Sequence, residues 1–79
     1  MISAYILIET SPGMAGQVAQ EIRRYPFVKR ANAVTGPYDV ICMVEAENLS
    51  DIGKNVFASI QRIEGVMRTL TCLNVDHQD

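Results

Sequence analysis

The segment V-T-G-P-Y-D-V at residues 34–40 constrains this chain more than any other feature of its sequence. Adjacent glycine and proline favour a reversal of the chain. Apolar runs at residues 28–34 and 40–44 flank the reversal, so the segment predicts a β-hairpin in the middle of the chain. The hairpin tip carries Tyr38 and Asp39, which makes it the first place to look for a specific binding site.

The length of 79 residues predicts a single domain over residues 1–79, and a domain this small gains stability from oligomerisation or covalent staples. The sequence shows no disulfide framework and no zinc-type cluster of cysteine and histidine. We interpret Cys42 and Cys72 as strand residues of a reducing, cytosolic protein. The chain is 48% hydrophobic, which points to oligomerisation.

Apolar runs predict four strands, and turn and capping residues predict two helices. The strands are expected at residues 4–8, 28–35, 39–46 and 66–75, followed by a polar tail at 76–79. Ser11 and Pro12 are expected to begin the first helix, which ends at Tyr25 before a proline. Asn48 is expected to cap the second helix, reinforced by the charge of Asp51 in its first turn, and Gly65 to close it in a left-handed cap.

Helical spacing of apolar residues predicts the buried face of each helix. In the first helix these residues are Met14, Ala15, Val18, Ala19 and Ile22. In the second they are Leu49, Ile52, Val56, Phe57, Ile60 and Ile63.

The resulting order, β-α-β-β-α-β, predicts an α+β fold of the ferredoxin-like type. A weak internal repeat supports two βαβ halves, because Val18, Ile22 and Val28 correspond to Val56, Ile60 and Val66 at a constant offset. Right-handed crossovers in both halves give an antiparallel sheet in the order 4-1-3-2 with both helices on one face.

The first and third strands are apolar at successive positions, so each presents apolar side chains to both faces of the sheet. The helices cover only one face, and the other would expose a large apolar patch to water. A second copy of the chain is the simplest cover, so we predict a homodimer that packs through open sheet faces.

No pattern typical of an enzyme, a metal site, a cofactor site or a nucleic-acid site occurs in the sequence. His77 is the only histidine, and it lies in the polar tail without a fixed partner. The net charge of −2 and the absence of a long apolar segment predict binding neither to nucleic acid nor to a membrane. The basic residues between positions 23 and 30 are interpreted as a solvated helix end.

Two polar groupings remain as candidate binding residues. They are Thr35, Gly36, Tyr38 and Asp39 at the central turn, and Arg68, Thr69 and Thr71 on the fourth strand. Each grouping can also be explained as ordinary turn or strand residues. In a 4-1-3-2 sheet they are not neighbours within one chain, so a joint site would need a second subunit or dimer.

Three motifs in the right order resemble the effector-binding domain of Lrp/AsnC regulators, also called the RAM domain. They are V-T-G-P-Y-D at the hairpin, I-E-G-V-M-R-T-L-T at residues 63–71, and A-Y-I-L-I-E-T-S-P-G at residues 4–13. The resemblance spans residues 3–75. It implies sheet-to-sheet dimers of the dimeric α+β barrel type, assembly into octamers, and an amino-acid effector bound between dimers.

The resemblance implicates five binding residues: Gly36, Tyr38, Asp39, Thr69 and Thr71. Asp39 would accept hydrogen bonds from an α-ammonium group, and threonine hydroxyls with backbone N–H groups would hold a carboxylate. Full-length regulators carry a helix-turn-helix domain before this domain, so the chain is expected to be a stand-alone module that modulates a full-length regulator.

Two alternatives stay open at this point. One is a small enzyme of the dimeric α+β barrel type, such as a monooxygenase or isomerase, although such enzymes usually use a histidine, asparagine or tryptophan in a pocket between sheet and helices. The other is a structural or adaptor oligomer that binds no ligand.

Overall fold

The computed structural model describes residues 1–76 and contains the predicted β-α-β-β-α-β order. The elements are β1 (Ile2–Thr10), α1 (Ala15–Ile22), β2 (Val28–Ala33), β3 (Val40–Ala46), α2 (Leu49–Ala58), a 3₁₀ turn η1 (Ile60–Arg62) and β4 (Val66–Leu73). β1 is longer than expected because it pairs along both of its edges, with β3 and with β4. β2 ends two residues earlier than expected, because the hairpin loop begins after Ala33.

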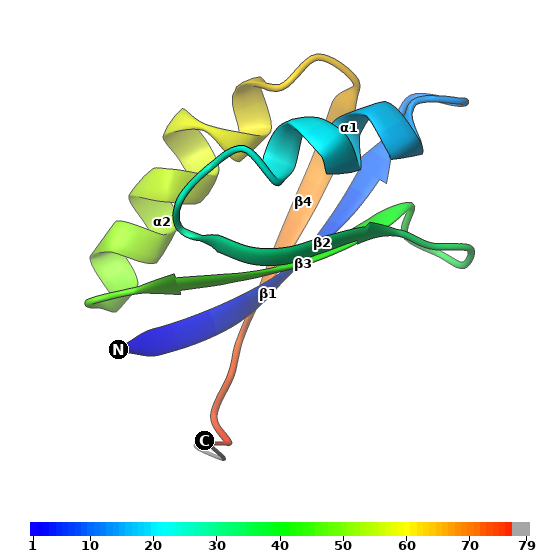
Figure 1. Ribbon diagram of the computed structural model, residues 1–79. Coiled ribbons are helices and arrows are strands. Elements are labelled where there is room, and N and C mark those ends of the chain that lie inside the picture. Colours follow the sequence, from blue (N-terminus) through cyan, green and yellow to red (C-terminus); the bar gives the residue numbers. More distant parts are fainter. Residues whose placement is uncertain (77–79) are drawn as a thin grey trace.

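The four strands form one antiparallel sheet in the order β2-β3-β1-β4, and both helices lie on one side of it (Figure 1). This order is the predicted 4-1-3-2 order seen from the opposite edge. The α+β ferredoxin-like fold is therefore confirmed.

The core lies between the helices and the covered face of the sheet. Alternate residues are buried there, from Ala4 to Ile8 in β1 and from Val40 to Ala46 in β3, and the helices contribute apolar side chains from above. The largest fully buried side chains are Ile6, Ile8, Val18, Ile22, Val40, Cys42, Val44, Ile52 and Ile60. Each buried isoleucine contributes roughly 1.5–3 kcal/mol relative to an exposed one, so these residues dominate the stability of the fold.

The start of α1 differs from the prediction. The helix begins at Ala15 with Met14 at its N-cap and no side-chain cap, so Ser11 does not cap it and Pro12 is not its first residue. The backbone N–H of Ser11 donates to the Gly65 carbonyl at 2.8 Å, and its own carbonyl accepts from Met14 at 3.1 Å. Residues 11–14 therefore form a turn that is tied to a distant loop.

The end of α1 also falls earlier than expected. The helix ends at Ile22, and the chain continues in a tighter turn in which Arg24 donates to Glu21 and Tyr25 donates to Ile22. These i→i+3 bonds carry the chain to Tyr25, where the following proline disfavours further helix.

The buried stripe of α2 is narrower than predicted. Ile52 and Val56 are buried, whereas Leu49 and Phe57 are 58% and 68% exposed. Leu49 is the first residue of the helix, and Phe57 lies about 100° around the helix axis from Val56, which turns it off the buried stripe. The predicted cap is confirmed, since the Asn48 side chain accepts from the backbone N–H of Asp51 at 2.9 Å.

Gly65 has the predicted positive φ of +99°, but it does not close α2. The helix ends at Ala58, and η1 intervenes before Gly65. Because the N–H of Val66 donates to the carbonyl of Ile63, Gly65 is the third residue of a β-turn, where a positive φ favours glycine. An added Cβ at Gly65 would lie 2.9 Å from the Met14 side chain, so the turn also packs closely on the start of α1.

Candidate functional site

The hairpin between β2 and β3 is closed by backbone hydrogen bonds at its base. The N–H of Val34 donates to the Asp39 carbonyl at 2.9 Å, and the N–H of Asp39 donates to the Ile8 carbonyl of β1 at 2.8 Å. At the tip Gly36 has φ of +151°, a backbone conformation that residues with a Cβ rarely adopt. The tip therefore has a defined loop conformation, and Tyr38 and Asp39 are half-buried at its base.

The Asp39 carboxylate has a structural partner. Its Oδ2 atom accepts from the backbone N–H of Thr10 at 2.8 Å. The β1–β4 register shifts between Glu9 and Thr10, so this donor lies at an irregularity where the strand ladder does not continue regularly. Asp39 therefore links the hairpin to the end of β1 and keeps a second carboxylate oxygen for another donor.

Thr69 and Thr71 lie on the same face of β4. Thr69 pairs with Ile8 and Thr71 pairs with Ile6, so both threonines belong to the helix side of the sheet. Thr71 is exposed, whereas Thr69 is half-buried and its Oγ1 atom accepts from Nε2 of Gln61 at 2.8 Å.

The two predicted groupings lie at the same level of the sheet but do not meet. Ile8 accepts from the N–H of Asp39 on one side and pairs with Thr69 on the other. Two strand spacings separate Asp39 from Thr69, which is about 10 Å, and β1 fills the space between them. This agrees with the expectation that one chain does not join the two groupings.

A cavity of about 280 Å³ lies beside Thr69 at the start of β4. Its walls are Gln61, Val66, Met67, Arg68 and Thr69. Ligand pockets usually enclose roughly 300–1,000 Å³, so the cavity is close to the lower limit for a small ligand.

Gln61 and Met67 line this cavity, but they were not predicted from the sequence as binding residues. The contact between Gln61 and Thr69 spans the turn at residues 63–66, and no local pattern marks it. Met67 is likewise joined to a distant residue, because its sulfur accepts from the hydroxyl of Ser11 at 3.4 Å.

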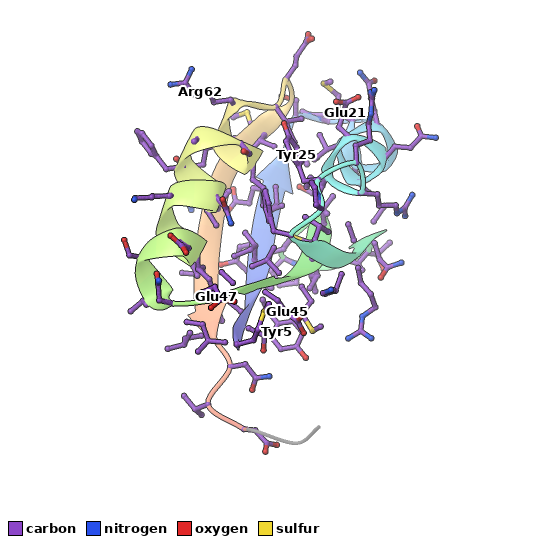
Figure 2. The ribbon with its side chains drawn as sticks, turned by 60° about the vertical axis from the view of Figure 1, so that its left-hand side comes forward. Tyr5, Glu21, Tyr25, Glu45, Glu47 and Arg62 are labelled. Carbon is purple, nitrogen blue, oxygen red and sulfur yellow. The ribbon has the colours of Figure 1, made fainter. Side chains whose placement is uncertain are left out.

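The sheet face opposite the helices has an apolar centre. Two rows cross the strands there, one of Leu70, Leu7 and Ile41 and one of Cys72, Tyr5 and Met43. Figure 2 shows Tyr5 and Glu45 on this side of the sheet, away from the helices. Four of the six apolar side chains are exposed, namely Tyr5, Ile41, Leu70 and Cys72. The predicted apolar character of both faces of β1 and β3 is therefore confirmed.

Ion pairs border this apolar centre at both ends. Arg68 pairs with Glu9 at 3.2 Å at one end, and Lys29 pairs with Glu45 at 3.6 Å at the other. An apolar centre with a polar rim is the usual anatomy of a protein–protein interface.

The basic residues near the end of α1 are largely paired within the chain. Nε of Arg23 donates to the Ala31 carbonyl at 2.9 Å, and Arg24 pairs with Glu21 at 3.0 Å. A second cavity, of about 260 Å³, lies beside them along β2. All four basic residues of this cluster are exposed, which agrees with its interpretation as a solvated helix end.

Burial raises the pKa of the Cys42 thiol from its ordinary value of 9.0 to about 11. The thiol is therefore neutral at physiological pH and belongs to the core, whereas Cys72 is exposed on the open face. Within residues 1–76 no group of three or more histidine, cysteine, aspartate or glutamate side chains is placed to bind a metal ion. His77 lies outside the described residues.

Neither helix within residues 1–76 combines the length and the apolar composition needed to cross a bilayer.

Comparison with known proteins extends over nearly the whole chain. The Lrp/AsnC ligand binding domain matches residues 3–76. An uncharacterised HTH-type transcriptional regulator of Pyrococcus abyssi is 31% identical over 77 residues, which span 94% of this chain and 51% of that protein. One from Pyrococcus horikoshii is 33% identical over 91% of this chain and 50% of its own length. The chain thus spans about half the length of these relatives.

Solved structures of similar length share the fold. TTHA0845 from Thermus thermophilus superposes with a TM-score of 0.91 at 30% identity, covering 100% of this chain and 99% of that one. FFRP-DM1 superposes with a TM-score of 0.88 at 31% identity, covering 95% of this chain and all of that one. At 18% identity, a Neisseria meningitidis regulator solved as an L-Met complex has the same fold with a TM-score of 0.85 over 99% of this chain and 52% of that one. The chain belongs to the Lrp/AsnC ligand-binding domain family.

Proposed function

We propose that this chain is an oligomeric sensor domain that binds an amino acid and thereby regulates transcription through an Lrp/AsnC-type regulator. The observation that most supports this proposal is that two groups of candidate binding residues, here called half-sites, lie at the same level of the sheet. The Asp39 carboxylate lies at the hairpin, and the cavity beside Thr69 lies across β1. The relatives are described as transcriptional regulators, and one structural neighbour was solved with L-Met.

The proposed assembly begins with a homodimer formed through the open sheet faces. The rows that contain Leu7, Ile41 and Leu70 are apolar and partly exposed in the single chain, and a second copy would bury them. Higher assembly, for example into an octamer, would then bring the hairpin of one dimer near β4 of another.

In the proposed site Gly36, Tyr38 and Asp39 of one subunit face Thr69 and Thr71 of another. The free oxygen of Asp39 accepts from the α-ammonium of the amino acid, and the threonine hydroxyls donate to its carboxylate. Tyr38 contributes an aromatic wall, and Gly36 gives the loop the conformation that exposes these groups.

A thermal-shift screen of the twenty amino acids, with native mass spectrometry of the same samples, tests this proposal. A ligand at a hundred times its Kd stabilises the folded state by about 2.7 kcal/mol. For a domain of this size that shifts the Tm by roughly 10 °C or more. L-Met is the first probe because of the solved neighbour.

The matched variant is Asp39→Asn, whose amide oxygen can still accept from Thr10 but carries no charge for an ammonium group. We expect stabilisation of the wild type by at least one amino acid and loss of that stabilisation in Asp39→Asn. Equal shifts in both proteins would exclude Asp39 from the site, and no shift with any amino acid would contradict the proposed ligand class.

A further inference from the structure

The hydrogen bond between Gln61 and Thr69 fixes the polarity of the cavity at the start of β4. Nε2 of Gln61 lies 2.8 Å from Oγ1 of Thr69, and both residues line the cavity of about 280 Å³. Gln61 belongs to η1 and Thr69 to β4, so the contact spans the turn at residues 63–66.

The direction of this bond determines what Thr69 can offer to a ligand. A hydroxyl has one proton to donate and two lone pairs that accept. The side-chain amide nitrogen of Gln61 can only donate, so it occupies a lone pair of Thr69 and leaves the hydroxyl proton for another partner. Thr69 is thereby held as a hydrogen-bond donor.

The charge around the cavity has the same preference. Arg68 lines the cavity and is positively charged, whereas no acidic residue is among the residues that line it. Arg68 pairs with Glu9 at 3.2 Å on the face of the sheet opposite to Thr69, so it adds positive charge beside the cavity rather than a donor inside it. A cavity with a hydroxyl donor, no acidic lining residue and a cation beside it favours an anionic group.

We propose that Gln61 is a positioning residue that makes this cavity the receptor for the anionic end of the ligand. Gln61 need not touch the ligand, because it acts by holding the Thr69 hydroxyl with its proton directed into the cavity. The inference rests on the proposed function for the identity of the ligand, but the preference for an anion can be tested without it.

The test uses acetate as an anionic probe and methylammonium as a cationic probe. Binding of each is monitored through the backbone NMR signals of Thr69 and Arg68. In the wild type, acetate shifts these signals and methylammonium does not. Gln61→Met has a side chain of similar length that cannot donate, and it weakens acetate binding about 3- to 10-fold. Gln61→Glu presents an acceptor to the hydroxyl and adds a negative charge, so it removes the response to acetate.

Two controls separate positioning from general effects. Gln17→Glu makes the same charge change at an exposed site on α1 and leaves the acetate response unchanged. In a double-mutant cycle, Gln61→Met has no further effect once Thr69→Val has removed the hydroxyl. An effect of Gln61→Met that persists in Thr69→Val, or a wild type whose Thr69 signal does not respond to acetate, would overturn the inference.

The outcomes also distinguish this inference from the proposed function. An acetate response that depends on Gln61, without stabilisation by any amino acid, would support the anion cavity and contradict amino-acid sensing. Amino-acid binding at Asp39 that is unchanged in Gln61→Met and Gln61→Glu would support sensing and contradict the role of Gln61.

Discussion

The carboxylate of Asp39 accepts a hydrogen bond from the backbone N–H of Thr10 at 2.8 Å, which ties the central hairpin to the end of β1. A residue that the sequence marks as a binding candidate therefore also stabilises the fold. The two contributions can be separated by substitutions that keep or remove the acceptor.

We expect Asp39→Ala to lower the free energy of unfolding by about 1–3 kcal/mol, because the partly buried N–H of Thr10 loses its acceptor. Asp39→Asn keeps an oxygen in place and is expected to lose much less. Urea denaturation of both variants measures the difference. Equal stability of the two variants would show that the bond to Thr10 does not matter for folding.

Gly36→Ala is expected to destabilise the protein by roughly 1 kcal/mol or more, because φ of +151° strains a residue with a Cβ. Gly53 in α2 gives the matched control, since an added Cβ there meets no atom within 4 Å. Gly53→Ala should stabilise the protein by about 0.5–1 kcal/mol through its helix propensity. Thermal unfolding compares the two, and stabilisation by Gly36→Ala would contradict the loop geometry.

The Cys42 thiol makes the stability depend on pH in the alkaline range. Its pKa rises from 9.0 to about 11 on folding because of burial, so the folded state favours the neutral thiol. The contribution of the neutral thiol to the free energy of unfolding is complete below about pH 9, and it is lost as the pH rises from 9 through 11. In urea unfolding at stepped pH, Cys42→Ala should show a shallower loss over this interval. Identical slopes would contradict the burial of the thiol.

Ile41→Lys is expected to disrupt the proposed homodimer, because it places a charge in the apolar row formed with Leu7 and Leu70 on the open sheet face. Analytical ultracentrifugation at micromolar concentration should show an oligomer for the wild type and a monomer for the variant. Gln17→Lys on the exposed side of α1 serves as the charge control. In the same samples, iodoacetamide should modify Cys72 faster in the variant. A monomeric wild type would contradict the proposed interface.

The elements and much of the core could be predicted from the sequence, because the information that determines them is local, and the right-handed crossover rule then gives the strand order. Helical spacing around Val18 and Ile52 specifies which helix side chains are buried, and apolar runs specify the strands. The two-sided apolar character of β1 likewise predicted an open face that needs a cover. Apart from the strand order, each of these features depends on neighbours within a few residues along the chain.

The features that could not be predicted depend on contacts between distant segments. Ser11 has the chemistry of a helix cap, but its N–H is bonded to Gly65 on another loop. Phe57 is a different case, because the geometry of the helix itself turns it away from the core. Gln61 has no local signature because its contact with Thr69 spans a turn. The candidate site was therefore only partly accessible from the sequence.

The central claim, that one binding site combines residues of two subunits, is tested most directly by complementation. Asp39→Asn disables the hairpin half-site, Thr69→Val disables the β4 half-site, and neither variant alone should bind the amino acid found in the screen. After the two variants are unfolded together and refolded, random mixing should restore up to about a quarter of the sites, measured by isothermal titration calorimetry. A mixed sample that binds no more ligand than the separate variants would contradict a site shared between subunits.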